Sequence, residues 1–116
     1  MGYEFYPEAL EATLRRAWGV GLGTPLLVTD NGLATADNSE RIAFVTRALE
    51  GVRRCLGDGV DLRGYFYWSA FDNFEWAFGY SKTFGLIAVD RTSQRRQIRP
   101  SAVWLGGIAR SASGAA

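Results

Sequence analysis

Hydrophobic residues recur at helical spacing in two segments of the chain. In the first segment, residues 7–18, the side chains of Leu10, Leu14 and Ala17 fall on one face of a helix. Pro7 suits the first helical position, because a proline there gives up no intrahelical hydrogen bond. We therefore predict a helix over residues 7–18, which ends at the glycine-rich run behind it.

The second segment, residues 37–56, is the longest predicted helix. Asp37 and Glu40 have the spacing of a capping box, in which each side chain accepts a hydrogen bond from a backbone N–H group at the helix start. Cys55 is interpreted as a small apolar residue of this helix. The stripe expected to face the core consists of Ile42, Val45, Leu49, Val52 and Leu56.

Two shorter segments, residues 25–30 and 62–69, are predicted strands. The first is an almost unbroken apolar run, which is typical of a strand buried on both faces, and the turn signal Asn31–Gly32 follows it. A strand, a long helix and another strand make a βαβ unit with parallel strands and a right-handed crossover. This order places Asp30 at the carboxyl end of the first strand.

The rest of the chain is less regular. We expect residues 70–80 to be irregular, 84–90 to be extended, 100–110 to form a last helix and 111–116 to be a disordered tail. The last helix should turn three side chains inward: Val103, Trp104 and Ile108. A basic patch is interpreted as a solvated surface loop, and it consists of Arg95, Arg96 and Arg99.

Composition narrows the classes of function. The 116 residues suffice for one domain, and the net charge of +1 gives no sequence-wide attraction to nucleic acid or to a membrane. One cysteine excludes an intrachain disulfide, and the lack of histidine excludes a Ser-His-Asp or Cys-His triad and a histidine metal site. Neither a membrane-spanning run nor a signal peptide is visible. The expected location is cytoplasmic.

Polar and aromatic side chains gather where the two predicted strands end, which is the edge that faces the ligand crevice in parallel sheets. Carboxylates accept hydrogen bonds from pairs of hydroxyl groups, and aromatic rings cover the C–H faces of a pyranose, so the combination suits a sugar. The alternative is that the aromatic residues pack in a core. The two clusters are Asp30 with Asn31, and Trp68, Ser69, Asp72, Asn73, Glu75 and Trp76.

Several motifs resemble those of family 1 glycoside hydrolases, the β-glucosidase family. Residues 26–32 read LLVTDNG and resemble the nucleophile motif [IV]-T-E-N-G. Residues 63–76 read RGYFYWSAFDNFEW and resemble the sugar-binding signature W-S-x-x-D-N-[FY]-E-W. Residues 79–86, GYSKTFGL, are similar to the G-Y-x-x-R-F-G-L continuation, and residues 100–104, PSAVW, resemble the last helix of the family.

The resemblance covers nearly the whole chain and implies its fold class. The expected fold is α/β, a partial (β/α) barrel that corresponds to strands seven and eight of an eight-stranded TIM barrel. Residues 1–116 would then be a single C-terminal fragment of such a barrel domain. The N-E-P motif, which carries the acid/base glutamate of the family on strand four, does not occur in this sequence.

The resemblance also implies roles for five residues. Asp30 occupies the nucleophile position, where the family has glutamate. Trp68 would form the floor of the sugar site, and Glu75 would accept hydrogen bonds from two sugar hydroxyls near O4 and O6. Trp76 would donate its indole N–H to a hydroxyl near O3, and Phe84 would line the same pocket.

Each role has a structural alternative. Asp30 could be a turn residue, Trp68 a barrel core residue and Glu75 a solvated loop charge. Asp72 and Asn73 are expected to brace their loop by local hydrogen bonds rather than to touch sugar. At position 30, the shorter aspartate draws the carboxylate back by one methylene, and a misplacement of this order costs about 10²-fold in rate.

Two classes of function therefore stay open. The first is a β-glucosidase-type hydrolase fragment that acts by retention, with activity that is residual or depends on assembly. The second is a non-catalytic sugar-binding or assembly module. No metal, nucleotide or organic cofactor is implied. The expected partners are a β-glucoside or glucose, and either a second copy or a complementary barrel fragment, because a lone βαβ unit leaves strand edges unpaired.

Overall fold

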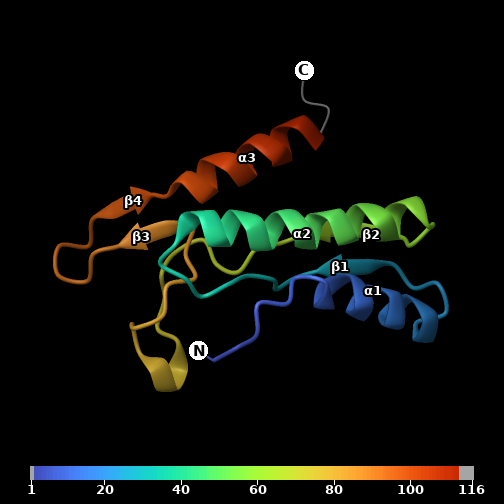
Figure 1. Cartoon of the computed structure of the whole chain (residues 1–116), viewed down its shortest axis with the longest axis horizontal. Coiled ribbons are helices and arrows are strands. Elements are labelled where there is room, and N and C mark those ends of the chain that lie inside the picture. Colours follow the sequence, from blue (N-terminus) through green and yellow to red (C-terminus); the bar gives the residue numbers. More distant parts are fainter. Residues whose placement is uncertain (1, 113–116) are drawn as a thin grey trace. The chain divides into compact units, whose positions relative to one another are not determined.

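A computed structural model describes residues 2–112 of the chain. The described residues form two compact units, the first made of residues 2–33 and 43–68 and the second of residues 34–42 and 69–112. The elements in chain order are α1 (Ala9–Val20), β1 (Leu26–Val28), α2 (Asn38–Gly57), β2 (Leu62–Tyr65), the 3₁₀ turn η1 (Trp76–Phe78), β3 (Ile87–Val89), β4 (Arg96–Ile98) and α3 (Pro100–Ala112), as Figure 1 shows.

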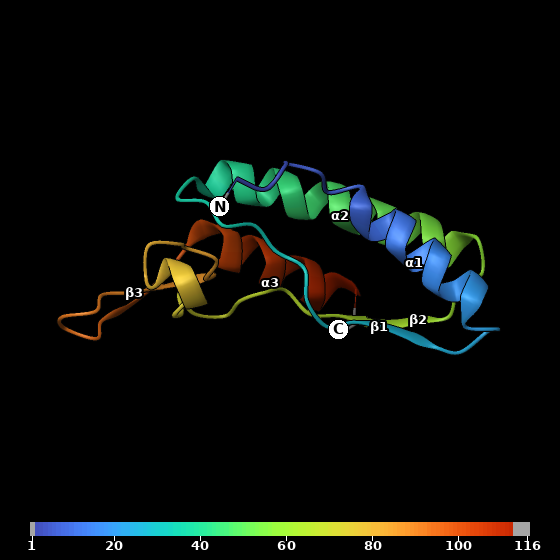
Figure 2. The same ribbon diagram turned by 90° about the horizontal axis from the view of Figure 1, so that it is seen from below.

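The first unit contains the predicted βαβ arrangement. Strands β1 and β2 pair in parallel, with Leu26 opposite Leu62 and Val28 opposite Tyr65. Figure 2 shows α1 and α2 on the same side of this strand pair. Both helices contribute to one apolar core, whose buried members are Leu14, Val28, Val52, Cys55 and Val60. The prediction of parallel strands joined by a long helix is confirmed.

Burial on both faces of the first strand, however, was a wrong expectation. Leu27 is 52% exposed although Val28, its neighbour in β1, is 5% exposed. Successive side chains of a strand point to opposite faces, and the helices of this unit cover only one of them. Phe66 and Trp68, which follow β2, are also exposed, at 58% and 41%.

The buried face of α2 is rotated from the predicted stripe. Leu56 is 48% exposed, whereas Phe44 and Ala48 are buried. The predicted stripe follows a seven-residue repeat, and such a repeat drifts around a straight helix by about 20° per heptad. Cys55 is fully buried, as expected of a small apolar helix residue, and burial raises the pKa of its thiol.

The start of α2 is capped differently from the predicted box. The Asp37 carboxylate accepts a hydrogen bond from the backbone N–H of Ser39 at 2.8 Å. Glu40 does not bond the backbone of Asp37 directly, because its carboxylate accepts the hydroxyl of Thr35. That hydroxyl oxygen in turn accepts the Asp37 backbone N–H at 3.1 Å. The Thr35 hydroxyl therefore bridges the Glu40 carboxylate and the Asp37 N–H, which a capping box would join directly.

An ion network joins the two helices of the first unit. The Glu11 carboxylate of α1 accepts hydrogen bonds from Arg54 of α2 at 2.7 Å and from Arg15 at 2.8 Å. These two hydrogen bonds, of which that from Arg54 has the larger effect, lower the pKa of Glu11 to about 2.

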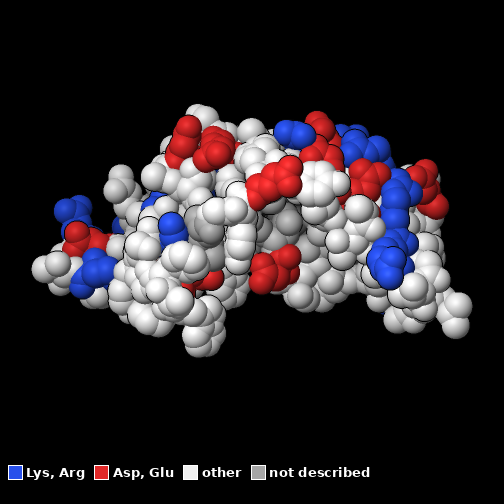
Figure 3. Space-filling model, turned by 60° about the horizontal axis from the view of Figure 1, so that its bottom comes forward, with Lys and Arg blue, Asp and Glu red and all other residues white. Residues whose placement is uncertain are grey.

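On the face drawn in Figure 3, acidic and basic side chains are interspersed rather than gathered into a patch of one sign.

The second unit contains an antiparallel hairpin that the sequence did not predict. Strand β4 pairs with β3, with Ala88 opposite Gln97. The interpretation of Arg95, Arg96 and Arg99 as one solvated loop was wrong, because Arg96 lies in β4 and the Arg99 side chain is only 14% exposed. All three residues of β4 are exposed, so no apolar alternation marks this strand in the sequence.

The last helix also differs from its expected orientation. Val103 and Ile108, predicted to face inward, are 65% and 38% exposed, and Trp104 is half-buried. The buried position is Ser101, whose hydroxyl donates to the Asn38 side-chain oxygen at 3.0 Å. Helix α3 includes residues 111 and 112 of the predicted disordered tail, and residues 113–116 lie outside the described residues. No described helix is long and apolar enough to cross a membrane.

Candidate functional site

Asp30 lies two residues beyond the carboxyl end of β1 and is exposed. It also borders a hollow of about 260 Å³ between α1 and β1, which is lined further by Leu10, Leu14 and Leu27. Within residues 2–112, β1 pairs with β2 on one edge, and no strand lies beside its other edge. The carboxylate therefore stands at the end of the strand where parallel sheets present reactive groups.

Trp68 is held next to the Asp30 segment by backbone contacts. Its N–H donates to the carbonyl oxygen of Asn31 at 3.0 Å, and the Tyr65 hydroxyl donates to the Asn31 side-chain oxygen at 2.8 Å. Burial raises the pKa of that Tyr65 hydroxyl, which keeps it protonated as a donor. Within the first unit, these bonds bring the predicted nucleophile position and the predicted sugar floor together.

Gly32 makes this close approach possible. A Cβ atom at position 32 would lie 1.9 Å from the carbonyl oxygen of Trp68, where no side chain fits. The Asn31–Gly32 pair was predicted as a turn signal, but residues 31–35 form no turn. The glycine is required here for backbone contact with the neighbouring segment.

In the second unit, three side chains form a hydrogen-bonded series. The Ser69 hydroxyl donates to Oδ1 of Asn73 at 3.2 Å, and Nδ2 of Asn73 donates to Oε2 of Glu75 at 3.1 Å. Ser69 is buried, while Asn73 and Glu75 are half-buried. The Glu75 carboxylate is therefore oriented from within its own loop rather than being a solvated loop charge.

Asp72 anchors the same loop through a bidentate ion pair. Arg99 donates to both carboxylate oxygens of Asp72 at 2.8 and 2.9 Å, and the backbone N–H of Gly85 donates to Oδ1 at 2.9 Å. The two side chains are 12% and 14% exposed. Burial would raise the pKa of Asp72, but the hydrogen bonds from Arg99 and Gly85 outweigh it and hold the pKa below its ordinary value. The expected bracing role of Asp72 and Asn73 is thus present.

Trp76 has a backbone conformation that is rare for a bulky residue. Its φ is +44°, and its side chain is 82% exposed. The turn around it is closed by a 2.7 Å bond from the Glu75 N–H to the Gly79 carbonyl. Strained residues of this kind persist where surrounding structure enforces them, and they cluster at functional sites.

Phe84 is the one predicted sugar-site residue that the second unit buries, at 8% exposure. The carbonyl of the preceding Thr83 accepts two donors, the Thr35 backbone N–H at 3.1 Å and a guanidinium nitrogen of Arg41 at 2.8 Å. Arg41 is fully buried and binds carbonyl and amide oxygens of residues 35, 38 and 83, while its Nε has no hydrogen-bond partner within residues 2–112.

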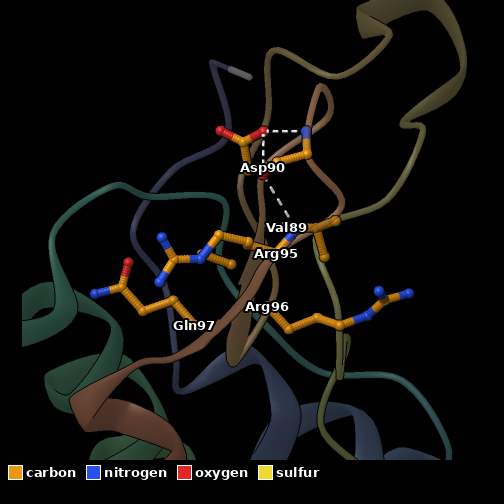
Figure 4. Close-up of a pocket in the computed structure, with 7 residues that line it drawn as sticks. Val89, Asp90, Arg95, Arg96 and Gln97 are labelled. Carbon is orange, nitrogen blue, oxygen red and sulfur yellow. Dashed lines mark hydrogen bonds between the residues drawn. The ribbon is translucent and has the colours of Figure 1, made fainter.

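A further hollow lies on the β3–β4 hairpin, and none of the residues that line it is a predicted site residue. Figure 4 shows that Arg95 and Gln97 point to one side of the strand and Arg96 to the other. The Asp90 carboxylate is engaged by the N–H of Ser93 at 2.7 Å. Because its charged groups diverge, this hollow offers no convergent binding site.

The structure thus places the predicted residues in two groups. Asp30 and Trp68 belong to the first unit, and Glu75, Trp76 and Phe84 belong to the second. Sequence reasoning missed Arg41 and Arg99, which organise the loops of the second unit. Each has a decisive partner far away in the chain, Thr83 for Arg41 at 42 positions and Asp72 for Arg99 at 27, and no sequence pattern marks either pairing.

Comparison with known proteins gives a consistent result. The family model described as glycosyl hydrolase family 1 matches residues 1–113. A bifunctional beta-D-glucosidase/beta-D-fucosidase of Bifidobacterium breve is 45% identical, over 90% of this chain and 25% of that protein. A beta-galactosidase of Sulfolobus acidocaldarius is 42% identical, over 95% of this chain and 22% of its own length.

Solved structures agree in fold. The crystal structure of beta-glycosidase BGL167 superposes with a TM-score of 0.93 at 58% identity, over 97% of this chain and 27% of that protein. A beta-glucosidase from Thermotoga maritima in complex with glucoimidazole gives a TM-score of 0.91 at 33% identity, over 95% and 27% of the two chains. These neighbours are TIM-barrel enzymes, whereas the described residues of this chain form no closed barrel.

The chain therefore spans about a quarter of the length of its relatives, with the two strands, the long helix and the sugar-binding signature expected of that part. It belongs to glycosyl hydrolase family 1 and matches one part of a family 1 glycosidase.

Proposed function

We propose that this chain supplies the nucleophile side of a β-glucosidase-type site that hydrolyses β-glucosides with retention. Asp30 at the carboxyl end of β1, tied through Asn31 to Trp68, is the observation that carries the proposal. Trp68, Glu75, Trp76 and Phe84 would hold the sugar. Relatives are named as beta-glucosidases, beta-galactosidases and a beta-fucosidase, which supports a β-glycoside as substrate.

In a retaining reaction, Asp30 would attack the anomeric carbon while a carboxylic acid protonates the leaving oxygen, and water would then release the glycosyl-enzyme. The two carboxyl groups of retaining enzymes lie about 5 to 5.5 Å apart. The acid would come from a group outside residues 1–116, because Asp72 is paired with Arg99 and Glu75 has the sugar-binding position. Activity would accordingly be residual or depend on assembly.

The partner would be either a complementary barrel fragment or further copies of this chain. Support comes from the first unit, where the second edge of β1 has no strand beside it in the described sheet and Leu27 is 52% exposed. Unpaired strand edges and exposed apolar side chains favour association with another chain. One relative is named as a beta-glucosidase mutant that forms a dodecameric structure in its crystal.

The unpaired edge of β1 and the exposed Leu27 also favour a second candidate function, a sugar-binding or assembly module without turnover. Aspartate at position 30 also favours it, because a nucleophile that is too short by one methylene reacts slowly. Such a module would keep the Glu75 and Trp76 contacts and bind glucose weakly, since part of a site covers only part of a sugar.

The test is release of nitrophenol from an aryl β-glucoside by the chain and by two variants at position 30. An aryl leaving group needs little acid assistance, so the missing acid matters least in this assay. We expect Asp30→Asn to abolish turnover and Asp30→Glu to raise it by about 10²-fold. Asp58→Asn, which makes the same change at an exposed position, should leave the rate unchanged.

Equal turnover by the chain and by Asp30→Asn would contradict a nucleophilic role for Asp30. If neither the chain nor Asp30→Glu turns over and both bind glucose, the binding module is the correct function. Sedimentation of the same samples checks the assembly, since a monomer with full activity would contradict the expected dependence on a partner.

A further inference from the structure

The Asn73 side chain has only one consistent hydrogen-bonding orientation. Its oxygen faces the Ser69 hydroxyl at 3.2 Å, and its nitrogen faces Oε2 of Glu75 at 3.1 Å. The same nitrogen also lies 3.4 Å from the carbonyl of Phe74. A carboxylate is only an acceptor, so the amide nitrogen must point toward Glu75. Asn73 therefore orients the Glu75 carboxylate by a charge-assisted hydrogen bond.

The other end of this hydrogen-bonded series is fixed. Ser69 is 9% exposed, its one hydroxyl proton is shared between the Phe71 carbonyl at 2.7 Å and Oδ1 of Asn73 at 3.2 Å, and its own carbonyl accepts the Leu86 N–H at 2.9 Å. Between Ser69 and Asn73, the Asp72 carboxylate is held on both oxygens by Arg99. Asn73 therefore links the Glu75 carboxylate to a loop segment that Ser69 and Asp72 anchor.

The backbone of Glu75 is fixed as well. Its N–H donates to the Gly79 carbonyl at 2.7 Å, its carbonyl accepts the Phe78 N–H at 2.9 Å, and the next residue has a φ of +44°. The freedom left to Glu75 is rotation of its side chain. Side chains with several rotatable bonds lose binding selectivity when they can follow the ligand, and a held rotamer prevents this.

We propose that Asn73 is a positioning residue for Glu75 and that it sets the preference of the site for the configuration of the sugar at C4. This inference rests on the proposed function, in which Glu75 binds two neighbouring sugar hydroxyls. A carboxylate held in one orientation fits the equatorial C4 hydroxyl of a glucoside and misses the axial hydroxyl of a galactoside. A carboxylate that rotates freely accepts both.

The experiment compares binding of methyl β-glucoside and methyl β-galactoside to the chain by NMR titration. Asn73→Asp keeps the oxygen that Ser69 donates to but replaces the donor to Glu75 with a second carboxylate. Asn73→Ala removes the donor without adding charge. Gln94→Glu is the matched control, because it makes the same amide-to-carboxylate change on the exposed hairpin of the same unit, where the amide contacts only the Arg91 carbonyl.

We expect both Asn73 variants to lower the ratio of glucoside to galactoside affinity by about three- to tenfold, the lower end for a hydrogen bond to a charged group that is half exposed. Gln94→Glu should keep the ratio of the unaltered chain. The ratio is the informative quantity, since a merely structural defect weakens both sugars in proportion.

Two results would overturn the inference, and they differ from each other. If the chain prefers the glucoside and both Asn73 variants keep the full ratio, Asn73 does not position Glu75, and the proposed function is unaffected. If the chain binds neither sugar, the sugar site itself is wrong, and the positioning role falls with it.

Discussion

Replacing Asp72 by asparagine should destabilise the second unit well beyond the loss of an ordinary surface charge. Asparagine keeps an oxygen that can face the Gly85 N–H and one guanidinium nitrogen of Arg99. Its amide nitrogen, however, replaces the oxygen that now lies 2.8 Å from the second guanidinium nitrogen. Two donors would then face each other, and the Arg99 charge would lose its partner.

The exposure of the Asp72 and Arg99 side chains sets the expected loss in the free energy of unfolding. Exposed ion pairs contribute about 0 to 1 kcal/mol, whereas removing one partner of a fully buried pair costs about 3 to 5 kcal/mol. With side chains 12% and 14% exposed, and with one of the two carboxylate oxygens preserved, the Asp72 pair lies between these limits. We expect the free energy of unfolding to fall by about 2 kcal/mol.

Urea unfolding followed by tryptophan fluorescence and by circular dichroism measures this loss. Asp61→Asn is the matched control, because Asp61 pairs with Arg63 at a similar distance of 2.9 Å with side chains 41% and 65% exposed. The control should cost much less, because exposed ion pairs contribute little to stability. If Asp72→Asn costs no more than Asp61→Asn, the bidentate pair does not stabilise the loop, and the reasoning is refuted.

The stabilisation that the Asp72 carboxylate provides should depend on pH. Because the pKa of Asp72 is lowered in the folded chain, its contribution is complete above the ordinary titration range of aspartate and is lost as the pH falls through the lowered pKa. The difference in stability between the unaltered chain and Asp72→Asn should therefore shrink below about pH 4.

Three further results are expected. Gly32→Ala should cost about 1 to 3 kcal/mol, because its Cβ would lie 1.9 Å from the Trp68 carbonyl, while Gly57→Ala, which meets nothing within 4 Å, should cost little; urea unfolding of both checks this. Glu11→Gln should flatten the fall in stability between about pH 4.5 and 2 that acid unfolding of the unaltered chain shows, because the pKa of Glu11 is lowered to about 2. The Cys55 thiol should react with a disulfide reagent only upon unfolding, since it is fully buried and burial raises its pKa; reaction at the rate of a free thiol in the folded chain would contradict this.

The regular part of the fold was predictable because its signals are local. Periodicity marked α1 and α2, and the order of strand, helix and strand predicted the parallel pairing of β1 and β2. Strand β4 was not predictable, because Arg96, Gln97 and Ile98 are all exposed and its pairing is made by backbone groups alone. The exposure of Leu27 also had no local signal, since it depends on what covers the second face of the sheet.

For the candidate site, the motifs suggested residues, and the hydrogen bonds that hold those residues could not be predicted from the sequence. Glu75 and Trp76 stand where the resemblance put them in the chain, and the sequence neighbours of Glu75 suggested local bracing. The partner of Asp72 is Arg99, 27 positions later, and a run of arginines gives no reason to single that one out. The Asn31–Gly32 pair, in contrast, is a familiar sequence signal whose structural role is different. It forms no turn, and Gly32 lies where its segment contacts the backbone of Trp68.

The buried guanidinium of Arg41 has a consequence for how the second unit comes apart in acid. Arg41 donates to the carbonyl oxygens of Thr35 and Thr83, so these contacts involve no carboxylate, whereas the Asp72–Arg99 pair is lost when Asp72 is protonated. Acidification should therefore release the loop around Asp72 before the contact between residues 35 and 83. In native-state hydrogen exchange at low pH, the Gly85 amide would lose protection while the Thr35 amide, which donates to the Thr83 carbonyl, is still slow to exchange.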